Sequence, residues 1–274
     1  MLKNALRSGA GAVAPFMWSR FLSDSGFTWP NEKKFGVTFS FNLEVDDDVE
    51  ALPWLADAFS AHDYPCSIAC TGRLVEAKPR EHAKLTDEGH EAVNHSYSHP
   101  ELLNKLSERQ IEEEITKCEV VLERELGVKP IGFRCPNFGL ANSNAIYRVL
   151  EERGYSYSSS TNCINTPNHG MPYHPAGSDF LAQGKMKVLE LPLMACPAHY
   201  YPLFDDWHCF RGKAHEGDFV EVFKQALAMG EEHGLLLNFY FHPRFFGAQL
   251  TKALDALSES KAWVGTLEQA AGLF

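Results

Sequence analysis

From residue 35 onward, apolar stretches of strand length alternate with amphipathic stretches of helix length. Continuous apolar runs predict buried strands, and apolar positions that recur with the period of a helix predict amphipathic helices. The predicted strands are 35–43, 66–70, 91–94, 131–134, 156–159, 188–191, 235–241 and 262–264. The predicted helices are 49–62, 79–87, 107–126, 142–153, 217–232 and a last one that begins at Thr266. Repeated strand–helix units of this kind predict an α/β fold with a parallel barrel.

Two stretches interrupt the alternation. Residues 161–187 are rich in glycine, proline and asparagine and show little periodicity, and residues 195–215 also lack a clear repeat. We expect both to form long loops over the mouth of the barrel. The chain has no internal repeat, low-complexity tract or linker-like stretch, so residues 35–274 are predicted to form one domain.

The first residues need a separate interpretation. A basic region and a short apolar region resemble a signal peptide, but Pro15 and Arg20 interrupt the apolar run, and no small-residue cleavage site follows. The run is also too short to span a bilayer. We therefore expect residues 1–34 to be an N-terminal arm, packed on the barrel or on a second subunit in a homo-oligomer, and we expect a cytoplasmic protein.

The composition limits the partners. The chain has 274 residues, of which 45% are hydrophobic, and 36 acidic residues against 25 basic ones give a net charge of −11 at pH 7. This charge disfavours nucleic acids and anionic membrane surfaces as partners. The 7 cysteines include no Cys-x-x-Cys pair, and several lie in apolar runs. They are typical of small buried residues in a reducing compartment and not of a disulfide framework.

Four polar clusters follow predicted strands. Asn42 and Glu44 end the first strand, and Arg134 and His242 begin similar clusters further along the chain. A fourth cluster, Asn94–Pro100, contains two of the twelve histidines at positions 95 and 99. Because the carboxyl ends of parallel strands meet at one rim of a barrel, these side chains are predicted to converge on one active site.

The convergent residues indicate a metal centre. Glu44, His95 and His99 supply a carboxylate and two imidazoles, a set that leaves positions open for water and substrate. The expected metal is divalent zinc, with cobalt, iron, manganese and nickel as alternatives. His242 is a candidate general acid for a leaving amine. Taken alone, the two histidines are also compatible with a solvated loop or a satisfied pair of core histidines, and His242 with a buried core histidine.

The order of these motifs resembles the polysaccharide deacetylase superfamily, the NodB-homology or carbohydrate esterase family 4 type. The matching segments are Val37–Glu44, His95–Pro100, Gly132–Pro136, Tyr157–Ser160, Phe239–Pro243 and Trp263–Leu267. Together they span most of residues 35–270. The resemblance implies a distorted (β/α) barrel of seven or eight strands and a metal-dependent hydrolase that removes an acetyl or similar acyl group from an amino sugar or polysaccharide precursor.

The resemblance also implies roles for individual residues. His95 and His99 fall on the two metal histidines of the family, Arg134 on the arginine that orients the catalytic carboxylate, and His242 on the histidine that protonates the leaving group. The first motif departs from the family, because Asn42 stands where a general base is usual and Glu44 where an aspartate ligand is usual. The fourth motif has Ser158 in place of an aspartate.

An asparagine cannot accept a proton from water, so three outcomes stay open. The chain is a deacetylase that acts slowly, with Asp46, Asp47 or Asp48 as a substitute base or with none. Alternatively, it hydrolyses a cyclic or other small amide without a metal, as some relatives do, or it is a silent glycan-binding pseudoenzyme. Beside a neutral Asn42, Arg134 is expected to pair with a nearby aspartate or with an anionic group of the substrate.

Substrate contacts are expected from residues beside the same strand ends and from the second long loop. The substrate would be a carbohydrate or a small amide. His199 and Trp207 belong to a stretch dense in aromatic rings and polar tips, which is typical of a sugar-stacking wall and also of a packed cap or a subunit contact. The expected substrate-binding residues are Tyr97, Pro136, Asn137, Tyr240, His199 and Trp207.

Overall fold

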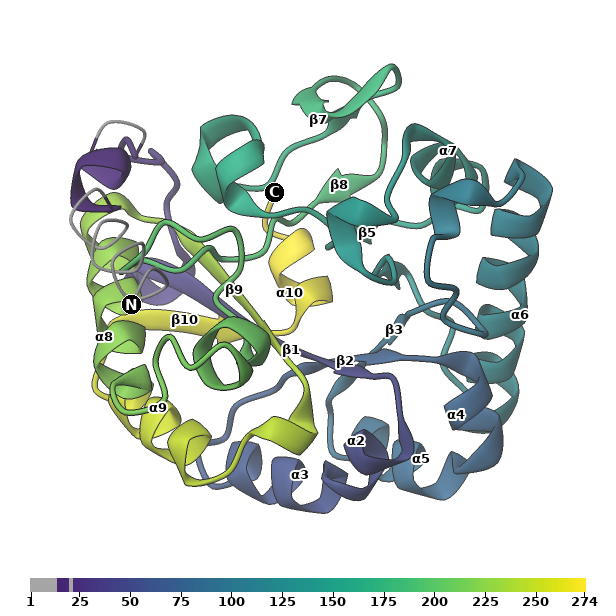
Figure 1. The fold of residues 1–274 in the computed structure, drawn as a ribbon, viewed down its shortest axis with the longest axis horizontal. Coiled ribbons are helices and arrows are strands. Elements are labelled where there is room, and N and C mark those ends of the chain that lie inside the picture. Colours follow the sequence, from purple (N-terminus) through teal and green to yellow (C-terminus); the bar gives the residue numbers. More distant parts are fainter. Residues whose placement is uncertain (1–13, 20–21) are drawn as a thin grey trace.

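The computed structural model describes residues 14–19 and 22–274. Its main feature is a parallel sheet that curls into a distorted barrel with helices around its outside, which confirms the predicted fold class (Figure 1). The sheet contains β1 (Phe35–Leu43), β2 (Ser67–Cys70), β3 (Glu91–Asn94), β4 (Gly132–Phe133), β5 (Tyr157–Ser158), β8 (Leu189–Glu190), β9 (Leu236–Phe241) and β10 (Ala262–Gly265). A separate antiparallel pair joins β6 (Pro175–Ala176) and β7 (Asp179–Gln183).

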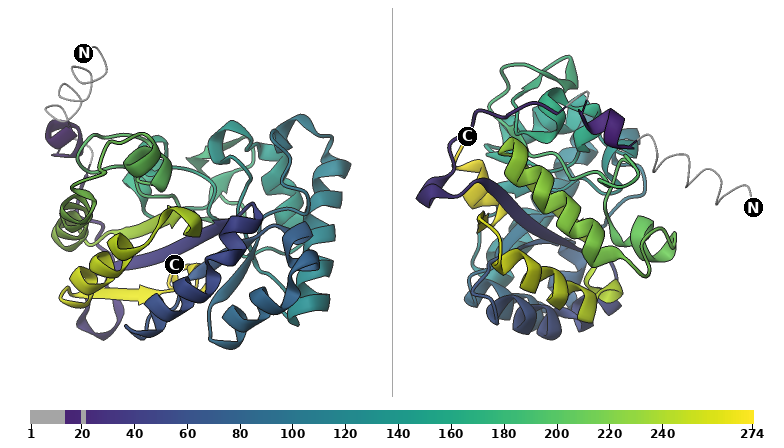
Figure 2. Two further views of the ribbon diagram at one scale, coloured as in Figure 1. Left: turned by 60° about the horizontal axis from the view of Figure 1, so that its bottom comes forward. Right: turned by 90° about the vertical axis from the view of Figure 1, so that its left-hand side faces the viewer.

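Helices follow one another around the outer face of this sheet, and Figure 2 shows the succession from two further sides. The α-helices are α2 (Asp46–Glu50), α3 (Leu52–Ser60), α4 (Gly72–Ala77), α5 (Pro79–Asp87), α6 (Glu108–Leu126), α7 (Asn144–Glu152), α8 (Phe219–His233), α9 (Ala248–Ser258) and α10 (Leu267–Ala271). Short helical turns are η1 (Pro30–Glu32), η2 (Leu103–Lys105), η3 (Phe138–Leu140), η4 (Cys163–Asn165), η5 (Pro167–Gly170), η7 (Pro243–Phe245) and the π-helical η6 (Trp207–Arg211). Among the described residues, no helix has both the length and the apolar character that a membrane crossing requires.

β1 is the central strand of the barrel. All of its residues are buried, and both of its edges are paired. β9 runs along one edge, while β10 pairs with the first half of the other edge and β2 with the second half. A strand enclosed in this way on every side is rich in apolar residues, which explains why its sequence signal was clear. It delivers Asn42 and Glu44 to the carboxyl end of the barrel.

The barrel closes between β8 and β9 through an asparagine. Asn238 in β9 donates a hydrogen bond of 3.0 Å from Nδ2 to the carbonyl of Leu191, and its own carbonyl accepts one of 2.8 Å from the amide of Met194. The amino end of the barrel is covered by α10, where the amide of Leu267 donates a hydrogen bond to Oγ of Ser67, the first residue of β2.

The predicted elements agree with most of the structure, and the main differences are the following. The predicted helix 49–62 is two helices, because Pro53 begins a new helix at the first turn of α3. Short α4 carried no clear signal, whereas α9 has apolar positions at a helical spacing that the prediction omitted. Residues 161–187, expected to be loop, contain the β6–β7 pair. The 7 cysteines are all buried and free, as expected.

The N-terminal arm lies partly outside the described residues, since residues 1–13 and 20–21 are not among them. Its described part packs on the barrel. Nε1 of Trp18 donates to the carbonyl of Pro197 at 2.9 Å, and Nε1 of Trp29 donates to the carbonyl of Gly234 at 2.9 Å. Both indoles are buried, so this part of the arm contributes apolar surface to the core.

Glu190 holds the loop that follows β5. Its fully buried carboxylate accepts hydrogen bonds from the amides of Ser160 and Thr161, at 2.7 and 2.8 Å, and from the hydroxyl of Tyr147 at 2.7 Å. Ser159 in the same loop accepts a hydrogen bond from Arg134. The carboxylate therefore fixes a segment that supports the rim of the barrel.

We predict that Glu190→Ala lowers the free energy of unfolding by about 3 kcal/mol or more, because it leaves several buried donors without an acceptor. Glu190→Gln should cost less, since its amide oxygen still accepts a hydrogen bond. Chemical denaturation of the three proteins measures the difference. Equal stability of the alanine and glutamine variants would contradict this role.

Candidate active site

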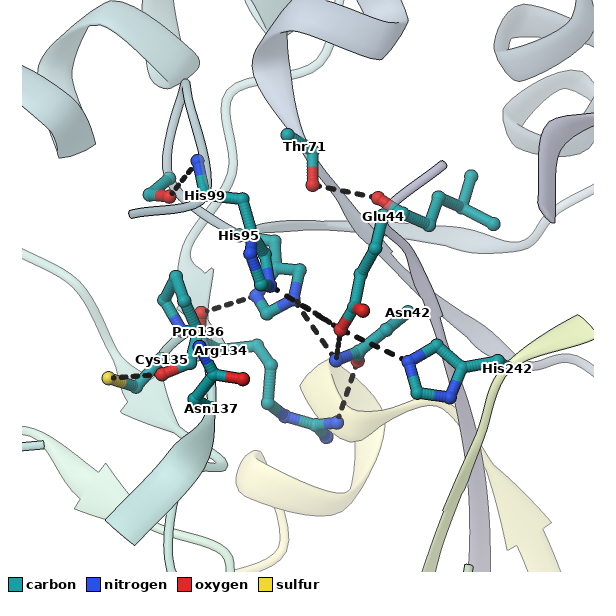
Figure 3. Close-up of polar contacts among 12 residues, drawn as sticks. Asn42, Glu44, Thr71, His95, His99, Arg134, Cys135, Pro136, Asn137 and His242 are labelled. Atoms are coloured by element: carbon teal, nitrogen blue, oxygen red, sulfur yellow. Dashed lines mark hydrogen bonds and ion pairs between the residues drawn. The ribbon is translucent and has the colours of Figure 1, made fainter. Parts of the chain in front are cut away.

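The side chains that follow four of the parallel strands meet at the carboxyl end of the barrel (Figure 3). β3 and β4 are short, and their last residues, Asn94 and Phe133, pair with each other. The residues that follow them, His95 and Arg134, carry polar side chains into the site. The group comprises Asn42 and Glu44 from β1, His95 and His99 after β3, Arg134 after β4, and His242 after β9. The structure therefore brings these side chains together as predicted.

Most of these side chains lie close to one carboxylate oxygen of Glu44. Oε1 of Glu44 lies 3.1 Å from Nε2 of His242 and 3.4 Å from Nε2 of His99. The same oxygen lies 3.7 Å from Nε2 of His95 and accepts a hydrogen bond of 3.2 Å from Nδ2 of Asn42. Burial raises the pKa of the Glu44 carboxyl, but the three histidines that face it, His242 above all, outweigh burial and hold the pKa well below its usual range. Glu44 is therefore ionised.

His95 presents a lone pair to this oxygen. Nδ1 of His95 lies 2.8 Å from the carbonyl of Arg134, so Nδ1 carries the proton and Nε2 is the free acceptor. The ring is fully buried, and burial lowers its pKa to about 4. His95 is consequently neutral at physiological pH, the form in which imidazole binds a metal.

His99 is held in an uncommon backbone conformation, with φ of +57°, and its amide donates to Oγ of Ser96. Its Nε2 atom is buried and, among the described residues, has no hydrogen-bond partner. A buried polar atom left in this state costs free energy unless a ligand satisfies it.

These observations fit a divalent metal. Glu44, His95 and His99 each offer a ligand atom, and the three atoms lie within 4.8 Å of one another. Two imidazoles and an ionised carboxylate suit zinc and neighbouring transition metals and leave coordination positions open. The unsatisfied Nε2 of His99 points to the same place.

Arg134 is a fully buried cation with neutral partners. Its guanidinium donates to Oδ1 of Asn42 at 3.2 Å, to Oγ of Ser40 at 2.9 Å and to Oγ of Ser159 at 3.0 Å. Burial lowers its pKa to about 10, so it stays charged at neutral pH. The expectation that Arg134 pairs with a nearby aspartate is wrong: among the described residues, no carboxylate lies within ion-pair distance of it.

Arg134 also sets the orientation of Asn42. Because Oδ1 of Asn42 accepts from the guanidinium, Nδ2 must point the other way, where it lies 3.0 Å from Nε2 of His95 and 3.2 Å from Oε1 of Glu44. The amide thus joins the arginine to the proposed metal ligands. At this position the chain offers a hydrogen-bond donor and no proton acceptor.

The three aspartates considered as substitute bases do not reach the site. Asp48 is buried, accepts hydrogen bonds from the amides of Glu44 and Val45, and forms an ion pair with Arg244. Asp46 and Asp47 are exposed, and Asp46 pairs with a lysine. Asp48 therefore stabilises the turn after β1 and does not face Asn42.

His242 has a carboxylate at each ring nitrogen. Nδ1 lies 3.1 Å from Oδ1 of Asp206, and Nε2 lies 3.1 Å from Oε1 of Glu44. Burial opposes the charged ring, but the hydrogen bonds that the ring donates to Asp206 and Glu44 outweigh burial and raise the pKa of His242 to about 10. Asp206 also accepts from the His242 amide at 2.7 Å. Sequence reasoning missed Asp206, whose only signal was its place in the polar, aromatic loop 195–215.

The expected substrate contacts fall in different places. Tyr240 is at the site, with its hydroxyl 3.3 Å from Nε2 of His242, and Pro136 is buried beside Arg134. Tyr97 lies between α4 and α6, where its hydroxyl donates to Glu76 and Lys117 covers its ring. It is held away from the metal ligands.

The loop residues His199 and Trp207 are also separate from the metal ligands. Trp207 is 57% exposed and stacks against Arg211, with the guanidinium carbon 4.2 Å from the ring centroid. The ring of His199 stacks on that of His215, with centroids 4.6 Å apart.

A pocket of about 490 Å³ lies beside the site. Phe138 connects the two, because its ring packs against Tyr240 with centroids 4.5 Å apart. The pocket combines apolar and aromatic side chains with amides, a composition suited to a sugar ring with polar substituents. Its lining includes Asn137, Phe138, Thr161, Asn162, Phe180 and Tyr201.

Comparison with known proteins identifies similar chains. The polysaccharide deacetylase family model matches residues 31–158, slightly less than half of the chain. A peptidoglycan-N-acetylglucosamine deacetylase of Bacillus cereus is 31% identical over 143 residues, which are 52% of this chain and 50% of that protein. The chain matches between a quarter and a half of the length of its curated relatives.

Two solved structures have the same fold. A Mycobacterium smegmatis protein assigned to the polysaccharide deacetylases has a TM-score of 0.72 at 21% identity, covering 92% of this chain and 94% of that one. A mutant of a Bacillus anthracis CE4 family pseudoenzyme, with restored enzymatic activity, has a TM-score of 0.56 at 16% identity, covering 89% and 69%. In its motifs, its barrel and these matches, the chain is similar to the polysaccharide deacetylase superfamily.

Proposed function

We propose that this protein is a metal-dependent hydrolase that removes an acetyl or similar acyl group from an amino sugar. The observation that carries the proposal is the arrangement around Oε1 of Glu44, where two imidazoles and His242 meet one carboxylate oxygen. An N-acetylated sugar is supported by the matched peptidoglycan-N-acetylglucosamine deacetylase and by the mixed apolar and amide lining of the pocket.

The residues would divide the chemistry between them. Glu44, His95 and His99 would hold the metal, which when bound lowers the pKa of a water ligand and polarises a carbonyl oxygen. His242 carries a proton that it can donate to the leaving amine, and Asp206 fixes the orientation of its ring. Arg134 positions Asn42 and supplies fixed positive charge close to the reacting groups.

Asn42 limits the rate in this mechanism. A missing general base typically lowers a rate by a factor of about 10² to 10⁴. We therefore predict that Asn42→Asp raises acetate release from N-acetylglucosamine oligomers by about 10²-fold, because the carboxylate can accept a proton and pair with Arg134. Asn31→Asp, the same substitution in η1 outside the site, should leave the rate unchanged. A rate of Asn42→Asp equal to the wild type would contradict the assignment of Asn42 to the base position.

Removal of the metal tests whether acetate release depends on it. We predict that protein treated with a chelator loses acetate release and regains it with zinc or cobalt, because the Lewis acid is then restored. In Asn42→Asp, which provides a measurable rate, His99→Ala should abolish turnover at every metal concentration that restores the parent. Full activity after chelation would contradict metal dependence.

A second function, glycan binding without turnover, is supported by one observation: Nδ2 of Asn42 donates toward both Glu44 and His95, so Asn42 presents a donor and no proton acceptor where a general base is usual in the family. Sugar binding by the wild type in calorimetry, with acetate release only from Asn42→Asp, would select this function over slow deacetylation.

The environment of His242 yields a prediction that does not depend on turnover. Removing the charge of Asp206 should lower the pKa of His242 from about 10, so Asp206→Asn should lose the ring proton at lower pH than the wild type. NMR titration of the His242 ring in chelator-treated protein measures this change. Asp205→Asn, which removes a neighbouring charge without a hydrogen bond to His242, should lower the pKa less. An unchanged titration in Asp206→Asn would contradict the pairing.

A further inference from the structure

A second group of metal-ligating side chains lies in the segment between β8 and α8. It consists of Cys196, His199, His208 and His215, whose ligand atoms lie within 4.8 Å of one another. Cys196 and His215 are buried, and His199 and His208 are half-buried at the surface. None of these four residues belongs to the group around Glu44. We call them the Cys–His cluster.

Two distances between ligand atoms in the Cys–His cluster are close to those between ligands of one tetrahedral ion. In a zinc site with bonds of about 2.0 Å to nitrogen and 2.3 Å to sulfur, two nitrogens lie about 3.3 Å apart and a sulfur and a nitrogen about 3.5 Å apart. Here Nδ1 of His199 is 3.3 Å from Nε2 of His208, and Sγ of Cys196 is 3.2 Å from Nε2 of His215.

Two turns of the backbone bring these residues together. Cys196 and Tyr201 form an isolated antiparallel bridge, with an amide-to-carbonyl hydrogen bond of 2.9 Å that folds His199 back toward Cys196. After η6, the amide of His215 donates to the carbonyl of Cys209 at 2.9 Å, which returns His215 to the neighbourhood of His208. The spacing is therefore Cys-x₂-His in one turn and two histidines in the next.

Asp218 orients one imidazole for metal binding. Its Oδ1 atom lies 3.0 Å from Nδ1 of His215, so Nδ1 carries the proton and the lone pair of Nε2 faces Cys196. A carboxylate that holds the far nitrogen of a histidine ligand is the usual arrangement around protein-bound zinc. Burial raises the pKa of the Cys196 thiol to about 12, so zinc would bind with release of that proton.

We infer that the Cys–His cluster is a structural zinc site, separate from the proposed catalytic metal. One thiolate and three imidazoles favour zinc over magnesium or calcium, which prefer oxygen ligands. Four protein ligands fill a tetrahedral shell and leave no position for substrate, which is typical of structural and not of catalytic zinc.

The site would act as a clip on an irregular segment. Asp206, which holds His242, lies between His199 and His208 in the chain, and Tyr201 stacks on His208 with ring centroids 4.3 Å apart. Tyr201 also lines the pocket. A metal that joins both turns would therefore fix one wall of the pocket and the partner of His242.

Cobalt substitution tests this inference without any assay of activity. The group around Glu44 contains no cysteine, so only the Cys–His cluster can give thiolate-to-cobalt charge-transfer absorption in the near ultraviolet. We predict this absorption in the cobalt-loaded wild type and in a His95→Ala/His99→Ala variant, which should also retain one zinc per chain when purified without chelator. Cys196→Ser should lose the absorption, whereas Cys118→Ser, a matched change of another buried cysteine in α6, should keep it.

Stability supplies a second readout. Zinc should raise the melting temperature of the His95→Ala/His99→Ala variant and should not raise it when Cys196→Ser is added. His208→Gln, at a half-buried position, serves if Cys196→Ser does not fold, and it should weaken zinc binding by at least about tenfold. Absence of both the charge-transfer absorption and retained zinc in the His95→Ala/His99→Ala variant would show that the four side chains form a hydrogen-bonded cluster only, and would overturn the inference.

Discussion

The site depends on the ionised carboxylate of Glu44 at the end of the central strand. Three histidines from two different strand ends surround its Oε1 atom, with Nε2 of His242 the nearest at 3.1 Å. The carboxylate is mostly buried, so its attraction for the charged ring of His242 is weakly screened. Burial and hydrogen bonding act on it in opposite directions, and the hydrogen bonds dominate. The proposed metal site and the proposed acid therefore share one anchoring atom.

A second constraint comes from the buried guanidinium of Arg134. Its neutral partners, Ser40, Ser159 and Asn42, replace the hydrogen bonds of water but not an opposite charge. The rings of Phe138 and Tyr240 lie within 5.5 Å of the guanidinium and partly offset that deficit. The arginine in turn decides which end of the Asn42 amide faces the histidines. One substitution relative to the family pattern thus changes both the charge balance and the hydrogen bonding of the site.

The irregular segment between β8 and α8 connects these features to the pocket. It supplies Asp206 to His242, Tyr201 to the pocket wall and all four residues of the Cys–His cluster. A long connection with so little regular structure pays a large conformational entropy cost on folding. A bound ion that crosslinks its two turns would reduce this cost. The Cys–His cluster would then stabilise the fold and would not take part in catalysis.

The sequence by itself determined the strands, most helices and the strand-end residues of the site, because buried parallel strands are continuously apolar and their polar successors must meet at one rim. It could not place Asp206 or the Cys–His cluster, since an irregular segment has no periodicity from which side-chain directions follow. It also could not decide the partners of Arg134, and the expected aspartate proved wrong. Those contacts join residues far apart in the chain, and only the closed barrel brings them within hydrogen-bonding distance.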